Sequence, residues 1–184
     1  VNWDIGGAVG LGVNGTASIE TINFPIYGNV GSGRTFINYG TFGSSVSSFG
    51  VVGTFINYGT STFNQPIATH FGGSIHNHGT LNIKALLQND GHVYQNTGTL
   101  LFDGGRPYTL SKFKFDWIGG DVNVTAGDTL TMGCPSIPGS GTLTNYGRVI
   151  IESFTDLINN GTIENFNSFL TNQRPFQNNG TFIN

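Results

Sequence analysis

The chain has 184 residues, of which 37% are hydrophobic, 12% aromatic and only 9% charged, and its net charge is −3. This apolar content can build a core, which excludes the highly charged type of disordered chain. The 7 basic residues are scattered along the sequence, which excludes the basic surface of a nucleic-acid-binding protein. No apolar run reaches the ~18 residues that a membrane-spanning helix needs.

The first residue is Val1, and no signal-peptide pattern follows it. We therefore expect either that a targeting segment has been removed or that the chain is a fragment. Cys134 is the only cysteine, so no intramolecular disulfide is predicted and its expected role is that of a small buried apolar residue.

A four-residue motif, Asn-x-Gly-Thr, recurs along the chain. Its first four copies are 19 or 20 residues apart and its last two are 19 apart, whereas an Asn-Tyr-Gly-Arg variant precedes the fifth full copy by 14 residues. A fixed period of this length indicates stacked structural repeats. The motif asparagines are Asn38, Asn57, Asn77, Asn96, Asn145, Asn159 and Asn178.

Apolar residues flank the motif on both sides: all seven residues two positions before the asparagine are apolar or aromatic, as are six of the seven residues four positions after it. This pattern predicts a short strand, a bend and a second short strand in each rung, by which we mean one turn of a solenoid. The bend needs glycine because a positive φ is readily adopted only by that residue. The predicted turn glycines are Gly40, Gly59, Gly79, Gly98, Gly147, Gly161 and Gly180.

Strand alternation places each motif asparagine on the same face as the apolar residue two positions earlier. The asparagines are therefore expected to point inward and to form a ladder of amide hydrogen bonds along the stack. A rung of this length buries its apolar face only by pairing with a parallel rung about 4.8 Å away. The predicted fold is an all-β, single-stranded parallel β-helix (β-solenoid) with about 19–20 residues per rung, right-handed and without a helix, because the only helix-compatible stretch, residues 83–88, is too short.

A longer repeat of about 110 residues is also visible. The string Trp3-Asp4-Ile5-Gly6-Gly7 resembles Trp117-Ile118-Gly119-Gly120, and the segment from Gly31 to Gly40 resembles the segment from Gly139 to Gly147. Within one solenoid domain, residues 1–184, we predict a first copy over residues 1–113 and an incomplete second copy over 114–184. Neither terminus has the pattern of a cap, so we expect a segment of a longer solenoid or a subunit that stacks head-to-tail into a filament.

The string from Gly139 to Gly147, together with the recurring Asn-x-Gly-Thr followed by an apolar residue, resembles the repeats of secreted parallel β-helix surface proteins of the filamentous haemagglutinin type. The resemblance covers most of the chain except about residues 103–135. It implies an extracellular or cell-surface location and a rod-shaped structural or adhesive role.

Residues next to the inward asparagines are expected to point outward. Stacking would align Tyr39, Tyr58, His76 and His78 into one exposed strip, here called the tyrosine–histidine strip. Aromatic rings in a row could bind a glycan or a receptor protein. The alternative interpretation is that the rings only stack on one another.

Metal binding and catalysis find weaker support in the sequence. His76 and His78, with His70 and His92 nearby, have no further ligands on neighbouring rungs, so no metal site is predicted. The acidic residues lie far apart, and we predict no enzyme activity, no catalytic residue and no cofactor. A polysaccharide-active β-helix stays an open alternative, resting on one loose group: Asp103, Arg106, Asp116 and Asp121.

A column of threonines three residues after the motif asparagines raises ice binding as a further alternative. The column contains Thr41, Thr60, Thr80, Thr99, Thr162 and Thr181, but the parallel column two residues later is mixed in character. An ice-matching surface needs more than a single file, so β-propensity on an exposed strand is the preferred interpretation. Glycosylation sequons occur, at the frequency expected from composition, at Asn14, Asn123, Asn160 and Asn179.

The sequence thus predicts a structural extracellular solenoid, with an adhesin segment that uses the tyrosine–histidine strip as the main alternative. The expected partners are the chain itself, adjoining repeats of a longer chain, or glycans, and neither nucleic acid nor membrane insertion is expected.

Overall fold

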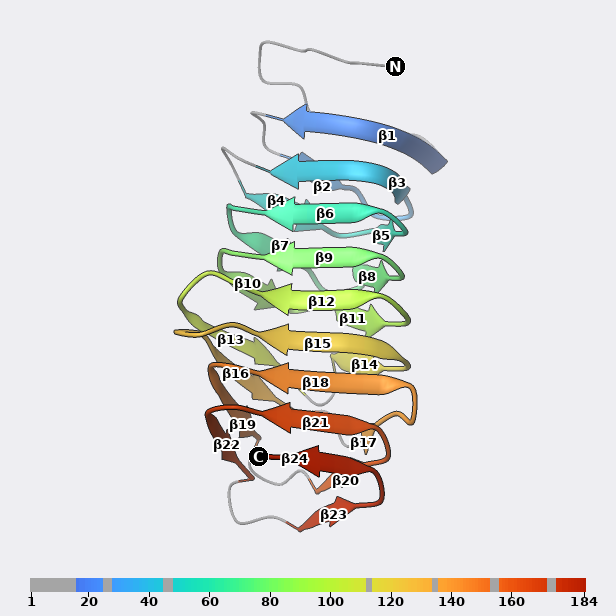
Figure 1. The fold of residues 1–184 in the computed structure, drawn as a ribbon. Coiled ribbons are helices and arrows are strands. Elements are labelled where there is room, and N and C mark those ends of the chain that lie inside the picture. The colour runs from blue at the N-terminus through green and yellow to red at the C-terminus, as the bar shows by residue number, and fades with distance from the viewer. Residues whose placement is uncertain are drawn as a thin grey trace.

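A computed structural model describes residues 16–24, 28–44, 48–111, 114–133, 136–152, 156–171 and 175–184. Trp3, Asn14 and Cys134 lie outside the described residues. The described chain forms an all-β, parallel β-solenoid of about seven turns without a helix, as the sequence predicts. In Figure 1 the front strands run from right to left, and the chain returns behind them as it descends, so the coil is right-handed.

Each rung has three strands, which form three faces of the solenoid. In the two N-terminal rungs, β1 (Thr16–Phe24) and β3 (Thr35–Ser44) each cover both the first and the second face. The first face continues through β5 (Thr54–Asn57), β8 (Ser74–Asn77), β11 (His92–Gln95), β14 (Phe115–Trp117), β17 (Ser136–Ile137), β20 (Leu157–Asn159) and β23 (Phe176–Asn178).

The second face continues through β6 (Thr60–Phe63), β9 (Thr80–Ile83), β12 (Thr99–Phe102), β15 (Gly120–Val124), β18 (Gly141–Asn145), β21 (Thr162–Asn165) and β24 (Thr181–Ile183). The third face consists of β2 (Gly28–Val30), β4 (Phe49–Val51), β7 (Ile67–Thr69), β10 (Leu87–Asn89), β13 (Pro107–Leu110), β16 (Thr129–Met132), β19 (Arg148–Ile151) and β22 (Ser168–Leu170). We number the corners by the face they follow.

All strand pairs are parallel and join equivalent residues of successive rungs. Thr54 to Asn57 of β5, for example, pair one-to-one with Ser74 to Asn77 of β8. Burial alternates along the strands, with the same half-buried, buried, half-buried, buried order in β5 and β8, as expected when successive side chains point to opposite faces. Like residues therefore lie over like residues along one axis.

The core is a column of apolar side chains enclosed by the three faces. Near the N-terminal end it is aromatic, with Phe36 stacked on Phe55 at a centroid distance of 5.5 Å and Phe42 packed edge-on against Phe49 at 5.2 Å. Phe63 completes this cluster and is fully buried. In the middle rungs mostly aliphatic residues take over, among them Leu81, Leu100, Val122, Leu130, Leu143, Val149 and Ile163.

The first corner is held by stacked glycines. Five predicted turn glycines, Gly59, Gly79, Gly98, Gly161 and Gly180, lie there, and each is so close to the rung before it that an added Cβ would run into that rung's backbone. The expected reason, a positive φ, was wrong for most of them, because only Gly98 has one, at 67°. Close approach of two backbones is the cause. Gly120 and Gly141 occupy this corner in the two intervening rungs and were missed, because no Asn-x-Gly-Thr motif surrounds them.

Candidate functional site

A buried amide ladder follows the first corner, as the sequence predicts. Asn38 Nδ2 donates to Asn57 Oδ1 at 2.9 Å, and Asn57 Nδ2 donates to Asn77 Oδ1 at 2.9 Å. Asn77 Nδ2 then donates to Gln95 Oε1 at 2.8 Å. All four side chains are fully buried, so the ladder runs through the interior next to the core.

The ladder amides also bond backbone groups at the corners. The backbone N–H of Gly40 donates to Asn38 Oδ1 at 3.2 Å, which fixes the oxygen on that side of the amide. Asn57 Nδ2 donates to the carbonyl oxygen of Thr80 at 2.9 Å, beyond the corner of the next rung. The amides therefore satisfy backbone groups that the bends would leave without partners in the interior.

The prediction that Asn96 belongs to this ladder was wrong. Gln95 pairs with Asn77 across the strands and supplies the ladder amide, whereas Asn96 lies on the outer side and contacts His78 Nε2 at 3.1 Å. The reason is the length of the corner, which here holds three residues between Gln95 and Thr99 in place of two. The longer side chain of glutamine reaches the same position that asparagine fills in the other rungs.

Asn145 is buried but lies at the second corner, where it starts a separate ladder. Its Nδ2 donates to Asn165 Oδ1 at 2.7 Å, and Asn165 Nδ2 in turn donates to Asn184 Oδ1. The backbone N–H of Gly147 donates to Asn145 Oδ1 at 3.0 Å, so Gly147 is a corner glycine of the second corner. The interval of 14 residues is irregular because Asn145 lies at the second corner of one rung and Asn159 at the first corner of the next.

Asn159 and Asn178 resume the ladder at the first corner. Asn159 is buried and its Nδ2 donates to Asn178 Oδ1 at 2.7 Å, while Asn178 itself is exposed. In the two preceding rungs Trp117 and Ile137 end the first-face strands instead. The indole N–H of Trp117 donates to the carbonyl oxygen of Gly120 at 3.0 Å. It thus satisfies a backbone carbonyl group at the first corner, as the ladder amides do in other rungs.

Three residues of the predicted tyrosine–histidine strip lie in one column outside the first corner. Tyr39 and Tyr58 are 58% and 47% exposed, and their rings stack at 5.2 Å with an interplanar angle of 7°. Tyr58 stacks in turn on His78 at 4.7 Å. The ring of Tyr58 is therefore covered on both faces, so mainly its edge and hydroxyl group face the solvent.

His76 does not join that column. It lies on the first face and stacks on Tyr94 of the next rung at 4.5 Å, and Tyr94 also stacks on His92 at 4.6 Å. His92 Nε2 is 2.7 Å from Asp116 Oδ2 of the following rung. Tyr94, His92 and Asp116 were missed as neighbours of His76, because the prediction placed Asn96 rather than Gln95 in register with Asn77.

The position of His76 makes its protonation unfavourable. Burial lowers the pKa of His76 from its ordinary value of 6.5, and positive charge on His78 and His92 lowers it further. Beside it lie the uncharged side chains of Ile56 on the preceding rung and Tyr94 on the next, and Asp116 is paired with His92.

We expect stability to fall as the pH drops below 6.5, where the unfolded chain takes up a proton that folded His76 resists. His76→Gln should remove this part of the loss. The check is denaturant unfolding of both proteins across that pH range. Equal acid losses in the two proteins would contradict the prediction.

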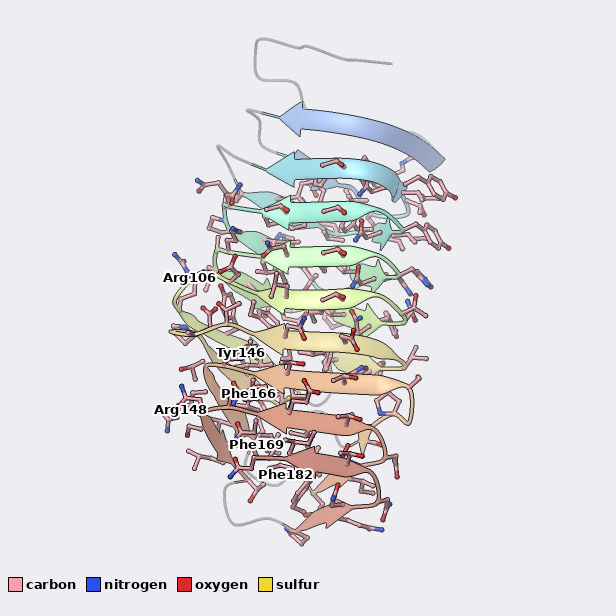
Figure 2. All side chains as sticks on the ribbon, viewed as in Figure 1. Arg106, Tyr146, Arg148, Phe166, Phe169 and Phe182 are labelled. Atoms are coloured by element: carbon pink, nitrogen blue, oxygen red, sulfur yellow. The ribbon has the colours of Figure 1, made fainter. Side chains whose placement is uncertain are left out.

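A second exposed aromatic pair lies at the second corner. Tyr146 and Phe166, one above the other in Figure 2, stack at 4.8 Å with an interplanar angle of 9°. They are 53% and 56% exposed. This pair is not evident from the sequence, because the segment around Phe166 lacks the glycine and threonine of the motif.

The charged residues of the open enzyme alternative do not meet in one place. Asp116 is on the first face, Asp121 is the second residue of β15 on the second face, and Asp103 follows the second face. Asp103 pairs with Lys84 of the preceding rung, with its Oδ2 at 3.0 Å from Lys84 Nζ. Arg106 is exposed at the second corner, to the left in Figure 2.

The described sequon asparagines lie at two kinds of position. Asn123 is half-buried in the middle of a second-face strand, whereas Asn160 and Asn179 are exposed at the first corner. Asn179 Nδ2 donates to Asn160 Oδ1 at 3.0 Å. Their modification stays a prediction, as does the division of the domain at residues 113 and 114.

Among the described residues, no three His, Cys, Asp or Glu side chains gather in a way that could hold a metal ion. The same part of the chain has no helix with the length and apolar character needed to cross a membrane. In the comparisons with known proteins, no family model, curated protein or solved structure matches the chain.

Proposed function

We propose that the chain is a structural solenoid of the cell surface or extracellular space, either a segment of a longer rod or a subunit that stacks head-to-tail into a filament. The observation that carries the proposal is the buried amide ladder at a glycine-lined corner. The ladder links successive rungs from Asn38 to Gln95 and again from Asn159 to Asn178, and such links along the axis are what a stiff rod requires.

Stiffness follows from how little freedom the rungs have. At Gly59, Gly79 and Gly161 the backbones of successive rungs approach too closely for any side chain, and the ladder amides beside them are bonded in the interior, where hydrogen bonds are strong and costly to break. Bending the rod would separate rungs on one side and break several of these contacts together.

The proposed location rests on surface chemistry. Only 9% of residues are charged, and the exposed residues of the first corner include the uncharged Tyr39, Tyr58, Ile118 and Asn160. Such a repetitive, weakly charged surface resembles that of secreted β-helix surface proteins. Their rods display one surface many times along their length.

Imaging of the native material tests the proposal. An antibody against the chain should label rods or filaments outside the cell, with an axial repeat that is a multiple of the ~4.8 Å rung spacing. Labelling of compact particles inside the cell would overturn it. For the head-to-tail form, the purified chain should assemble as its concentration rises, and a monomer that persists at high concentration would exclude that form.

An adhesin segment is the second candidate, favoured by the exposure of Tyr39 and Tyr58. Because both faces of the Tyr58 ring are covered, a glycan or receptor would contact its edge and hydroxyl group rather than lie on the ring. Tyr39→Ala combined with Tyr58→Ala should abolish binding on a glycan or receptor array.

The matched control for this experiment is Tyr146→Ala combined with Phe166→Ala, which removes the stacked pair of the other corner. It should leave binding intact. Equal loss in both double variants would show that stacking supports the fold and that the first corner has no special role in binding.

A further inference from the structure

The outward side of the second face is a regular array of small polar side chains. Strand pairing places Thr41, Thr60, Thr80 and Thr99 in one column on four successive rungs. The column continues through Asp121, Thr142, Thr162 and Thr181. Thr21 pairs with Thr41 at the start of the column, so threonine occupies eight of the nine positions from Thr21 to Thr181. Thr142 was missed, because its rung has no motif at the first corner.

A second column runs parallel to the first, two residues further along each strand. Gly43 lies in it and pairs with Thr62 of the next rung. Pairing places Asn123 and Thr144 there, after Thr62, Asn82 and Leu101. Glu164 and Ile183 follow. The face is therefore two columns wide, although Gly43, Leu101 and Ile183 interrupt the polar side chains of the second column.

The spacing of this array is fixed by the fold. Neighbouring positions are about 4.8 Å apart along the axis, and the two columns are about 6.6 Å apart, twice the rise of one strand residue. In Figure 1 the strands of this face lie one below another with little rotation between them, and Figure 2 shows short oxygen-tipped side chains in front of them. The axial spacing is close to the shorter repeat distance of the oxygen lattice of hexagonal ice.

The threonine side chains can hold water in such a pattern. Within the described part of the chain the hydroxyl groups of Thr60, Thr80 and Thr99 have no protein hydrogen-bond partner, while their carbonyl oxygens accept bonds from the ladder amides. β-Branching restricts χ1 to few rotamers, so hydroxyl and methyl groups repeat with the rungs. Asn38, Asn57 and Asn77 thus fix, from the inside, the backbone that carries these hydroxyl groups outside.

We infer that the second face binds ice, with the block from Thr41 to Thr99 and the adjacent Thr62 and Asn82 as its centre. Hydroxyl groups would anchor lattice waters, and the methyl groups between them would order the waters that bridge neighbouring rungs. This inference is independent of the proposed rod function, since a rod without this property and an ice-binding chain that forms no rod are both conceivable.

The test is partition of the purified chain into a slowly grown ice front, with inhibition of ice recrystallisation as a second readout. The chain should be enriched in the ice relative to a bystander protein. Thr60→Tyr combined with Thr80→Tyr should lose this enrichment, because two large rings would stand above the flat face.

The matched control is Thr109→Tyr combined with Thr131→Tyr, which places the same rings on paired positions of neighbouring rungs on the third face. It should be enriched in ice like the unchanged chain, and circular dichroism should show all three proteins folded. Three results would overturn the inference: no enrichment of the unchanged chain, full enrichment of the second-face variant, or equal loss in the third-face control.

Discussion

Asn57→Ala is expected to destabilise the fold by about 3–5 kcal/mol, since several buried polar groups lose their partners together and each costs about 1–3 kcal/mol. Asn57 Oδ1 accepts hydrogen bonds from Asn38 Nδ2 at 2.9 Å and from Ser61 Oγ at 2.8 Å. Its Nδ2 donates to Asn77 Oδ1 and to the carbonyl oxygen of Thr80, both at 2.9 Å. Alanine makes none of these four bonds and leaves a cavity that is unfavourable for the remaining polar atoms.

Denaturant unfolding measures the effect, and Asn96→Ala is the matched control. Asn96 belongs to the same sequence motif, but its side chain is on the outer surface beside His78, so its loss should change the free energy of unfolding by about 0.5 kcal/mol or less. Similar values for the two variants would mean that the ladder contributes no more than a surface contact.

Gly79→Ala is expected to cost about 3 kcal/mol or more, at the upper end of the range for overpacking. The new Cβ would lie far inside contact distance of the carbonyl oxygens of Gly59 and Tyr58 on the preceding rung. Neither atom belongs to a flexible side chain, so two rungs would have to move apart. The same unfolding experiment measures this loss.

Two other glycines separate crowding from backbone strain. Gly105→Ala should cost only about 1–2 kcal/mol, the price of a positive φ in an L-residue, because φ is 66° there and nothing lies within 4 Å of the added Cβ. Gly31→Ala should be nearly neutral, since its Cβ would meet only Arg34 Cγ at 3.8 Å. If Gly79→Ala resembled Gly105→Ala, the contact between rungs would not be what selects glycine at the corner.

The sequence predicted the solenoid because the period of its motif equals the length of one structural turn. Asn38, Asn57 and Asn77 recur at the length of one rung, and strand alternation alone turns them inward next to Phe36, Phe55 and Ile75. The motif could not reveal how many residues a corner holds, and this is why Asn96 was placed in the ladder and Gln95 was not.

The candidate site was less accessible to sequence reasoning, because it depends on register across rungs. The stack of Tyr94 between His76 and His92 appears only when β11 is paired correctly with β8. The ladder from Asn145 to Asn165 was hidden because Asn165 is followed by Phe166 and Asn167 instead of a glycine motif. Residues that have the same structural role in different rungs therefore do not have to lie in the same local sequence motif.

The buried amides all face one way. In each ladder the N–H group belongs to the earlier rung and the oxygen that receives it to the later one, from Asn38 to Gln95 and again from Asn145 to Asn165. Such a row therefore has one end that donates hydrogen bonds and one end that accepts them. Two rows continue each other when unlike ends meet and repel when like ends do, so the interior itself sets the direction in which solenoids of this kind can be joined.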